Sequence, residues 1–184
     1  MYRILGFVGP SGCGKDTATQ YIGNTEGFHV VTLCTTRPKR DTEKGNEYHF
    51  LDPSAFLTKV LNGDMLNAQE FRGWYYGVSK KDLSEDSINV MAMSNLMVDQ
   101  MMEEKCSEIE LMLVYIDAPE KDRLMNILQR EKDPDCAEVC RRFLTDEKDY
   151  TLNARLKNSC RYIISNNYTD DFFNSIMLIK NLYS

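Results

Sequence analysis

Residues 9–17 read Gly-Pro-Ser-Gly-Cys-Gly-Lys-Asp-Thr, and this glycine-rich segment lies between an apolar run at 4–8 and a stretch with helical spacing at 15–22. A turn of this kind between a strand and a helix points successive backbone N–H groups into one concavity, where a phosphate can lie against the helix N-terminus. Gly9, Gly14 and Lys15 satisfy the spacing G-x-x-x-x-G-K, in which the lysine reaches the β- and γ-phosphates of a nucleoside triphosphate. The segment therefore predicts a strand, a phosphate-binding loop and a helix at the start of an α/β fold.

The predicted contacts to ATP in this loop are Gly9, Pro10, Ser11, Gly12, Cys13, Gly14, Lys15, Asp16 and Thr17. A serine or threonine that binds Mg²⁺ usually follows the lysine of such a loop, but here Asp16 stands there and Thr17 comes next. Carboxylate and hydroxyl oxygens both suit Mg²⁺. We expect Mg²⁺ as the cofactor, and the sequence leaves open whether Asp16 or Thr17 binds it.

The composition limits the partners that this chain can have. A length of 184 residues with 42% hydrophobic residues fits one compact unit. The net charge of −6 and the pI near 5.0 argue against a general nucleic-acid binder, so an anionic substrate must meet a local group of cations. Six cysteines form no C-x-x-C pair, and no signal peptide or long apolar span is visible. We expect a cytoplasmic protein without a membrane partner, as a monomer or homodimer.

Strand and helix patterns alternate along most of the chain. Strands are predicted at 4–8, 29–34, 88–93, 110–117 and 162–165, and helices at 15–22, 94–105, 119–130, 137–156 and 170–182. This alternation predicts an α/β fold of the P-loop NTPase type, a parallel sheet with helices on both faces. Residues 1–34 and 86–184 would form that core.

Two segments depart from this alternation. Residues 35–85 hold short strand-like pieces at 47–51 and 69–76 and a helix that Asp52-Pro53 would start. We interpret them as an inserted subdomain that binds the substrate. Residues 131–136 join two helices and have arginines on both sides, which indicates a mobile lid over about 130–142.

Four motifs in order carry a family resemblance over nearly the whole chain. They are the phosphate loop, the segment Thr35-Thr36-Arg37-Pro38-Lys39-Arg40 with Glu43 and Tyr48 after it, the turn Tyr75-Tyr76-Gly77, and the pair Arg130 and Arg142. In this pattern the chain resembles the guanylate kinases. The resemblance implies an ATP-dependent kinase that transfers a γ-phosphoryl group to a nucleoside monophosphate (NMP), so residues 35–85 would be the NMP-binding insertion.

The resemblance also implies roles for individual residues. Arg37, Arg40, Tyr48 and Tyr76 would hold the acceptor phosphate in a loop that includes Glu43, and Arg130 and Arg142 would close over the transferred group. Asn166 falls where the family contacts the base of ATP, although it could equally belong to a turn that caps the next helix.

Elementary electrostatics supports the same roles. Two phosphates of like charge must meet for in-line attack, so cations are needed at the acceptor and around the transferred group. Arginine can bind phosphate oxygens with two parallel hydrogen bonds and stays charged. We therefore predict Lys15, Arg37, Arg130 and Arg142 as the catalytic residues. A monophosphate is already largely dianionic near neutral pH, so no general base is required.

The predicted base site departs from the family pattern. Counting back from Tyr76, the acidic residue that reads guanine falls on Asn67, and two hydroxyl positions become Leu33 and Val78. An amide accepts and donates, which suits the imide edge of thymine or uracil, including 5-substituted forms. These residues predict a thymine- or uracil-type deoxynucleotide as acceptor. A shift of the alignment to Glu70 would restore guanine.

Three alternatives remain open on the sequence alone. The first is a true guanylate kinase that acts on GMP or dGMP. The second is a sugar-phosphate kinase, because Ala92 in the strand at 88–93 and Ser94 just after it stand where the family has acids, and in this the chain resembles the ribose 1,5-bisphosphate phosphokinases. The third is a non-catalytic interaction domain with a guanylate kinase-like fold, which the retained Lys15 disfavours.

Overall fold

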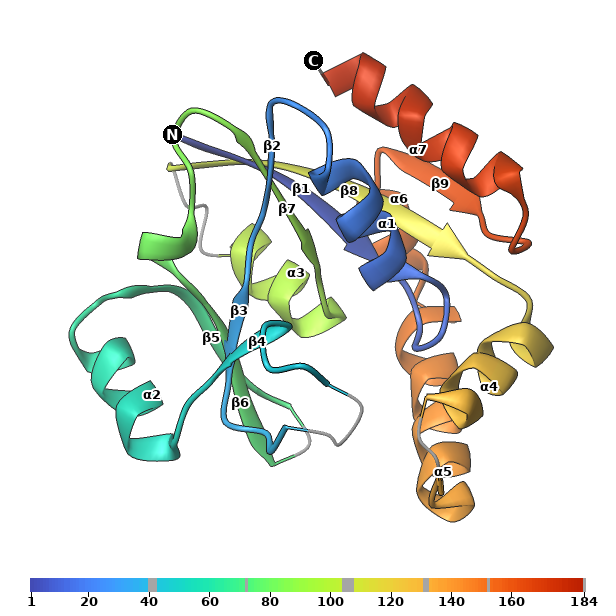
Figure 1. Cartoon of the computed structure of the whole chain (residues 1–184), viewed down its shortest axis with the longest axis horizontal. Coiled ribbons are helices and arrows are strands. Elements are labelled where there is room, and N and C mark those ends of the chain that lie inside the picture. The colour runs from blue at the N-terminus through green and yellow to red at the C-terminus, as the bar shows by residue number, and fades with distance from the viewer. Residues whose placement is uncertain (40–42, 72, 104–107, 131–132, 152, 184) are drawn as a thin grey trace.

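The computed structural model describes the chain except residues 40–42, 72, 104–107, 131–132, 152 and 184. Two sheets organise it (Figure 1). The first is a parallel sheet with the order β2 (Phe28–Val30), β7 (Ile88–Ala92), β1 (Tyr2–Val8), β8 (Ile109–Asp117) and β9 (Tyr162–Ser165). The second has the order β4 (Tyr48–Phe50), β3 (Leu33–Thr35), β6 (Trp74–Ser79) and β5 (Met65–Phe71).

The helices follow the strands in alternation. They are α1 (Lys15–Gly23), α2 (Pro53–Leu61), α3 (Asn95–Glu103), α4 (Glu120–Gln129), α5 (Cys136–Asp146), α6 (Ala154–Ser159) and α7 (Asp170–Tyr183). A 3₁₀ turn at Lys80–Asp82 leads back to β7, and a π-helical turn at Glu147–Thr151 follows α5. Within the described part of the chain, no helix combines the length and the apolar character needed to cross a lipid bilayer.

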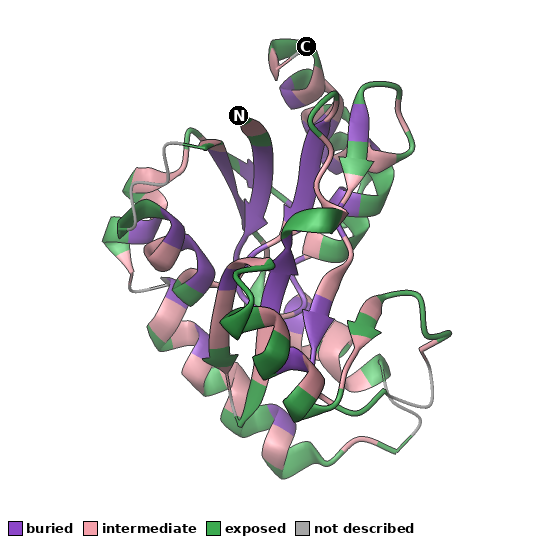
Figure 2. Ribbon diagram, turned by 90° about the vertical axis from the view of Figure 1, so that its left-hand side faces the viewer, coloured by how far each residue is buried: buried purple, intermediate pink, exposed green. Residues whose placement is uncertain are grey.

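The parallel sheet is buried on both faces, as Figure 2 shows for its central strands. Leu5 and Phe7 of β1 belong to a core cluster that also holds residues of α1 and α7. Ile4 and Val8 point to the other face, into a cluster with residues of α3 and α6. Near-continuous apolar strands are typical of a sheet that helices cover on both sides. The predicted α/β class is therefore confirmed.

Three predicted elements are wrong in their extent. The strand expected at 29–34 is split into β2 in the parallel sheet and β3 in the second sheet. The segment at 69–76 is not one strand but the turn of the β5–β6 hairpin, where Gly73 has a φ of 79°. The helix expected at 137–156 ends at Asp146, because the π turn changes the helical register before α6 begins. The first break lies within the mostly apolar run at 30–34, so hydrophobic periodicity does not reveal it.

The fold places several loops at the carboxyl edge of the parallel sheet. The glycine-rich loop follows β1, the central strand. The segments after β7, β8 and β9 begin at the same edge, because these strands are parallel to β1. The second sheet with α2 projects to one side of this edge, and α4 with α5 projects to the other (Figure 1). Open α/β sheets bind ligands at such an edge.

Candidate active site

The glycine-rich loop has a backbone shape that only glycine adopts readily. Gly9, Gly12 and Gly14 have φ values of 146°, 81° and 102°. A Cβ atom on Gly9 would lie 2.6 Å from the carbonyl oxygen of Ile116, and one on Gly12 would lie 2.5 Å from that of Arg123. The loop is therefore pressed against the end of β8 and against α4.

Side chains from distant segments hold the loop from behind. Asn126 Nδ2 and the Tyr168 hydroxyl both donate to the carbonyl oxygen of Gly12, at 3.2 and 2.8 Å. Asn166 Nδ2 donates to the carbonyl oxygen of Cys13 at 2.9 Å, and Asn166 is only 3% exposed. The structure thus places Asn166, a predicted ATP contact, under the loop. Sequence reasoning missed Asn126 and Tyr168, which belong to no motif.

The side chain of Cys13, a residue of the loop itself, is fully buried. Burial raises the pKa of its thiol above the ordinary value, against the opposing effect of Lys15. The neutral thiol fills space between the loop and the core, where it belongs to the apolar cluster of α1 and α7.

A lysine and a carboxylate occupy the mouth of the loop. Lys15 Nζ donates to the carbonyl oxygens of Gly9 and Pro10 at 2.7 and 3.0 Å. The amide of Ser11 donates to Asp146 Oδ2 at 2.8 Å, and Asp146 is 2% exposed. A carboxylate from the end of α5 therefore uses a loop amide that could otherwise bind a phosphate. No motif had pointed to Asp146.

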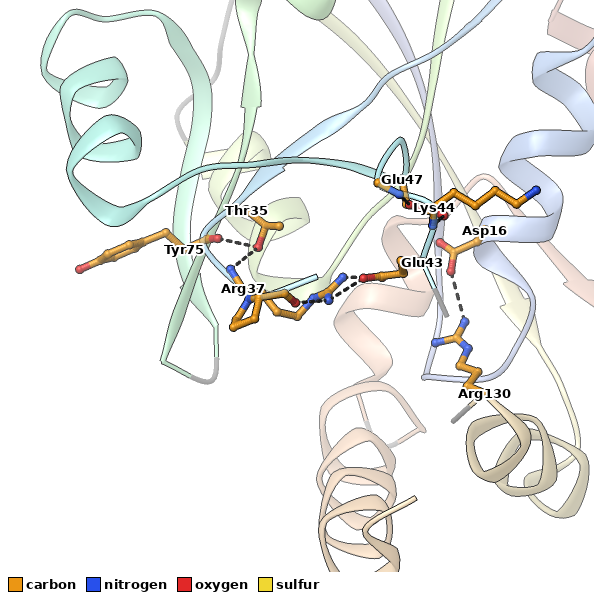
Figure 3. Close-up of polar contacts among 10 residues, drawn as sticks. Asp16, Thr35, Arg37, Glu43, Lys44, Glu47, Tyr75 and Arg130 are labelled. Carbon is orange, nitrogen blue, oxygen red and sulfur yellow. Dashed lines mark hydrogen bonds and ion pairs between the residues drawn. The ribbon is translucent and has the colours of Figure 1, made fainter. Parts of the chain in front are cut away.

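The predicted lid arginines are held by carboxylates. Arg130, at the end of α4, lies 3.2 Å from Asp16 Oδ2, and both side chains are well exposed (Figure 3). Arg142 on α5 donates from Nε to Glu138 at 2.6 Å. Hydrogen bonds from Arg141 and then Arg142 lower the pKa of Glu138 to about 2.

The predicted acceptor loop forms a compact cluster beside the second sheet. Arg37 makes two hydrogen bonds to Glu43, at 2.9 and 2.6 Å, with both side chains nearly buried (Figure 3). The guanidinium also lies 5.2 Å from the ring of Tyr48, whose centroid is 6.3 Å from that of Tyr76. Burial lowers the pKa of Arg37, but the hydrogen bonds and charge of Glu43 outweigh it and raise the pKa above the ordinary value. Arg40 lies outside the described residues.

The predicted base-reading residues lie where the second sheet meets α3. Val78 is fully buried and Leu33 packs against the same core cluster. Asn67 on β5 is 4% exposed and donates from Nδ2 to Gln100 Oε1 of α3 at 2.5 Å. Sequence reasoning missed Gln100, because only the packing of α3 on β5 brings the two residues together.

A divalent cation would find oxygen donors at the start of α1. Asp16 and Thr17 are both exposed there, directly after the loop lysine. No group of three or more acidic, histidine or cysteine side chains forms a metal site among the residues that the structure describes. One carboxylate and one hydroxyl beside a phosphate site fit Mg²⁺, which commonly takes its other ligands from phosphates and water.

The central position of β1, the glycine-rich loop after it and the helix that follows define a P-loop nucleotide-binding protein. The family model for guanylate kinase matches residues 1–179. The chain belongs to the guanylate kinase family, and the resemblance expected from its motifs is confirmed.

Individual relatives agree with this family. The chain is 35% identical over 99 residues to a guanylate kinase of Anaplasma phagocytophilum, a match that covers 52% of this chain and 47% of that protein. It is 30% identical over 150 residues to a guanylate kinase of Gloeobacter violaceus, covering 80% and 73%. MAGUK p55 subfamily member 7 of Xenopus tropicalis is 28% identical over 135 residues, covering 71% and 23%.

A solved structure supports the fold. The crystal structure of guanylate kinase from Anaplasma phagocytophilum superimposes with a TM-score of 0.67 at 20% identity, covering 99% of this chain and 84% of that one. The first of the sequence relatives is matched over about half of its own length.

Proposed function

We propose that this chain is an ATP-dependent nucleoside monophosphate kinase that uses Mg²⁺. The observation that carries the proposal is the phosphate loop with Lys15 at its mouth, set between cations from two separate elements. Arg37 belongs to the loop of the second sheet, and Arg130 and Arg142 belong to α4 and α5 (Figure 3 shows Arg37 and Arg130). A phosphoryl transfer between two anions needs this distribution of charge.

Each group has a part in the proposed reaction. The loop amides and Lys15 bind the phosphates of ATP, and Arg37 with Tyr48 and Tyr76 binds the acceptor phosphate. Asp16 and Thr17 would hold Mg²⁺, which supplies neutralisation of phosphate charge when it is bound. Arg130 and Arg142 would exchange their carboxylate partners for the transferred group as the lid closes. The acceptor phosphate is the nucleophile, so positioning and charge neutralisation provide the acceleration.

Two classes of acceptor base are compatible with Asn67. Thymine or uracil, which the sequence favours, would donate its N3–H to Asn67 Oδ1. Guanine would donate its N1–H to the same atom. A specific observation favours guanine as the second candidate: Asn67 turns its amide nitrogen to Gln100, and its oxygen has no donor among the described residues, so the atom left for a base accepts as a carboxylate oxygen would.

The test is a coupled assay of ADP release with Mg·ATP and a panel of acceptors. The panel holds GMP, dGMP, dTMP, dUMP, dCMP, dAMP, 5-substituted deoxyuridine monophosphates and ribose 1,5-bisphosphate. Turnover of a nucleoside monophosphate that Lys15→Met abolishes, with ATP binding largely retained, would support the proposal. Absence of turnover on the whole panel would reject it, and absence of ATP binding would indicate a non-catalytic interaction domain.

A further inference from the structure

Two amide side chains on one face of β5 turn their nitrogen atoms toward α3. Asn67 and Gln69 stand two residues apart along the strand and so lie on the same face. Asn67 Nδ2 donates to Gln100 Oε1 at 2.5 Å, and Gln69 Nε2 donates to Ser94 Oγ at 2.7 Å. Their oxygen atoms, Asn67 Oδ1 and Gln69 Oε1, are buried and have no hydrogen-bond partner among the described residues.

A buried carbonyl oxygen without a donor is costly, because it has lost its hydrogen bonds to water. Two such oxygens on one strand face are unusual in a folded chain. A ligand that supplies N–H donors would satisfy them. Since Asn67 is 4% exposed, such a ligand reaches Oδ1 only after the side chains that cover this oxygen move aside, while Asn67 keeps its contact with Gln100.

The orientation of the Asn67 amide decides which ligand edge fits. Its two possible arrangements with Gln100 are Nδ2–H to Oε1, as the structure has it, and the reverse, Nε2–H to Oδ1. In the first arrangement the oxygen of Asn67 faces away from Gln100 and can accept from a ligand, whereas in the second the oxygen faces Gln100 and the NH₂ group is turned to the ligand instead. Gln100 is therefore the group that sets the polarity of Asn67.

We propose that Gln100 is a positioning residue that fixes the amide of Asn67 with its oxygen toward the acceptor base. The inference rests on the proposed kinase function and names the class of base. The site selects bases with a ring N–H at the edge read, such as guanine, hypoxanthine, thymine and uracil. It rejects adenine and cytosine, whose ring nitrogen at that edge is an acceptor. Gln69 has its amide turned the same way, with Nε2 on Ser94 Oγ.

Two substitutions at one position test this orientation. In Gln100→Glu the new carboxylate can only accept, so Asn67 must still donate Nδ2 to it and present Oδ1. We expect the preference for ring N–H bases over dAMP and dCMP to stay within about threefold of wild type. In Gln100→Leu the amide is free to turn, and we expect the preference to fall about tenfold, the effect of one hydrogen bond.

The readout is the ratio of equilibrium dissociation constants for the preferred monophosphate and for dAMP or dCMP, measured by calorimetry. A merely structural role would change the melting temperature and the affinity for ATP but not this ratio. Gln20→Glu and Gln20→Leu, on the exposed face of α1, control for charge and for loss of an amide. Loss of the preference in Gln100→Glu, or an unchanged preference in Gln100→Leu, would overturn the assignment.

The double variant Asn67→Asp with Gln100→Glu is a second test. Asn67→Asp alone lets Gln100 turn and donate, whereas the pair sets two carboxylates against each other. We expect the double variant to bind the acceptor about tenfold more weakly than the product of the single effects predicts. Additive effects would contradict the assigned contact.

Failure of this inference and failure of the proposed function can be told apart, because binding is measured without turnover. A chain that binds monophosphates but transfers no phosphate overturns the proposed function, and the binding ratios then still decide the role of Gln100. A wild-type chain that binds no monophosphate overturns both.

Discussion

At the scale of single residues, Asp146 is a buried carboxylate in direct contact with the phosphate loop. Its carboxylate accepts the Ser11 amide, and its charge would repel a triphosphate in the same loop. In Asp146→Asn the hydrogen bond can remain while the charge is lost. We expect ATP to bind about three- to tenfold more tightly, as titration with ATP would show.

Asp149→Asn, in the π turn, is the matched control for Asp146→Asn and should leave ATP affinity within about twofold. Weaker binding of ATP to Asp146→Asn would show instead that the carboxylate works with the nucleotide.

Arg37 is the residue on which binding of the acceptor phosphate should depend most. A guanidinium that binds phosphate through charged hydrogen bonds contributes about 1.5–3 kcal/mol. We therefore expect Arg37→Ala to raise the KM for the acceptor by about 10- to 100-fold and to leave the KM for ATP nearly unchanged. Steady-state kinetics with each substrate varied would measure both. Arg141→Ala, which removes an exposed arginine paired with Glu138, should change neither.

At the scale of secondary-structure elements, the contact between the phosphate loop and α4 depends on Gly12. Gly12→Ala would strain a φ of 81° and also place Cβ 2.5 Å from the Arg123 carbonyl oxygen. Gly63→Ala has similar strain, at a φ of 73°, but no atom lies within 4 Å of its Cβ. We expect Gly63→Ala to cost about 1 kcal/mol of unfolding free energy and Gly12→Ala about 1–3 kcal/mol more, in urea denaturation. Equal losses would mean that the loop can move away from α4.

The start of α2 should make stability depend on pH. Asp52 accepts hydrogen bonds from the Ser54 hydroxyl and from the amides of Ser54 and Ala55, and these bonds lower its pKa. A lowered folded-state pKa means that the contribution is present above the unfolded pKa, near 4, and is lost as pH falls through the folded pKa. Asp52→Ala should therefore be less stable than wild type at pH 7, with a gap that closes in acid. Asp52→Asn, which caps without titrating, should show a gap to Asp52→Ala that does not close.

At the scale of the whole molecule, the two parts that carry the predicted catalytic arginines project from opposite sides of the sheet edge (Figure 1). In the proposed reaction the acceptor phosphate at Arg37 must meet the transferred group at Arg130 and Arg142, so α4–α5 and the second sheet would have to approach each other. We expect ATP and acceptor analogues together to reduce the radius of gyration in X-ray scattering more than either does alone. Lys15→Met with both analogues should still close if binding drives the motion. An unchanged radius in wild type would contradict a closing lid.

Much of the fold and part of the site could be predicted from local sequence. The glycine spacing in residues 9–14 is set by backbone conformations that other residues avoid, so the phosphate loop is visible without any tertiary information. The apolar runs at β1, β7 and β8 identify a buried parallel sheet for the same local reason. Arg37 and Glu43 also lie six residues apart in one loop, within reach of each other.

Only the tertiary structure decided which distant side chains complete the site. The contact of Ser11 with Asp146 spans 135 positions, and that of Asn67 with Gln100 spans 33. Both depend on how α5 and α3 pack, and neither leaves a local pattern in the chain. The sequence by itself therefore determined the phosphate loop and the α/β class, because backbone geometry and apolar periodicity are properties of neighbouring residues. The partners of the loop and of Asn67 were decided by packing, which joins residues that are far apart along the chain.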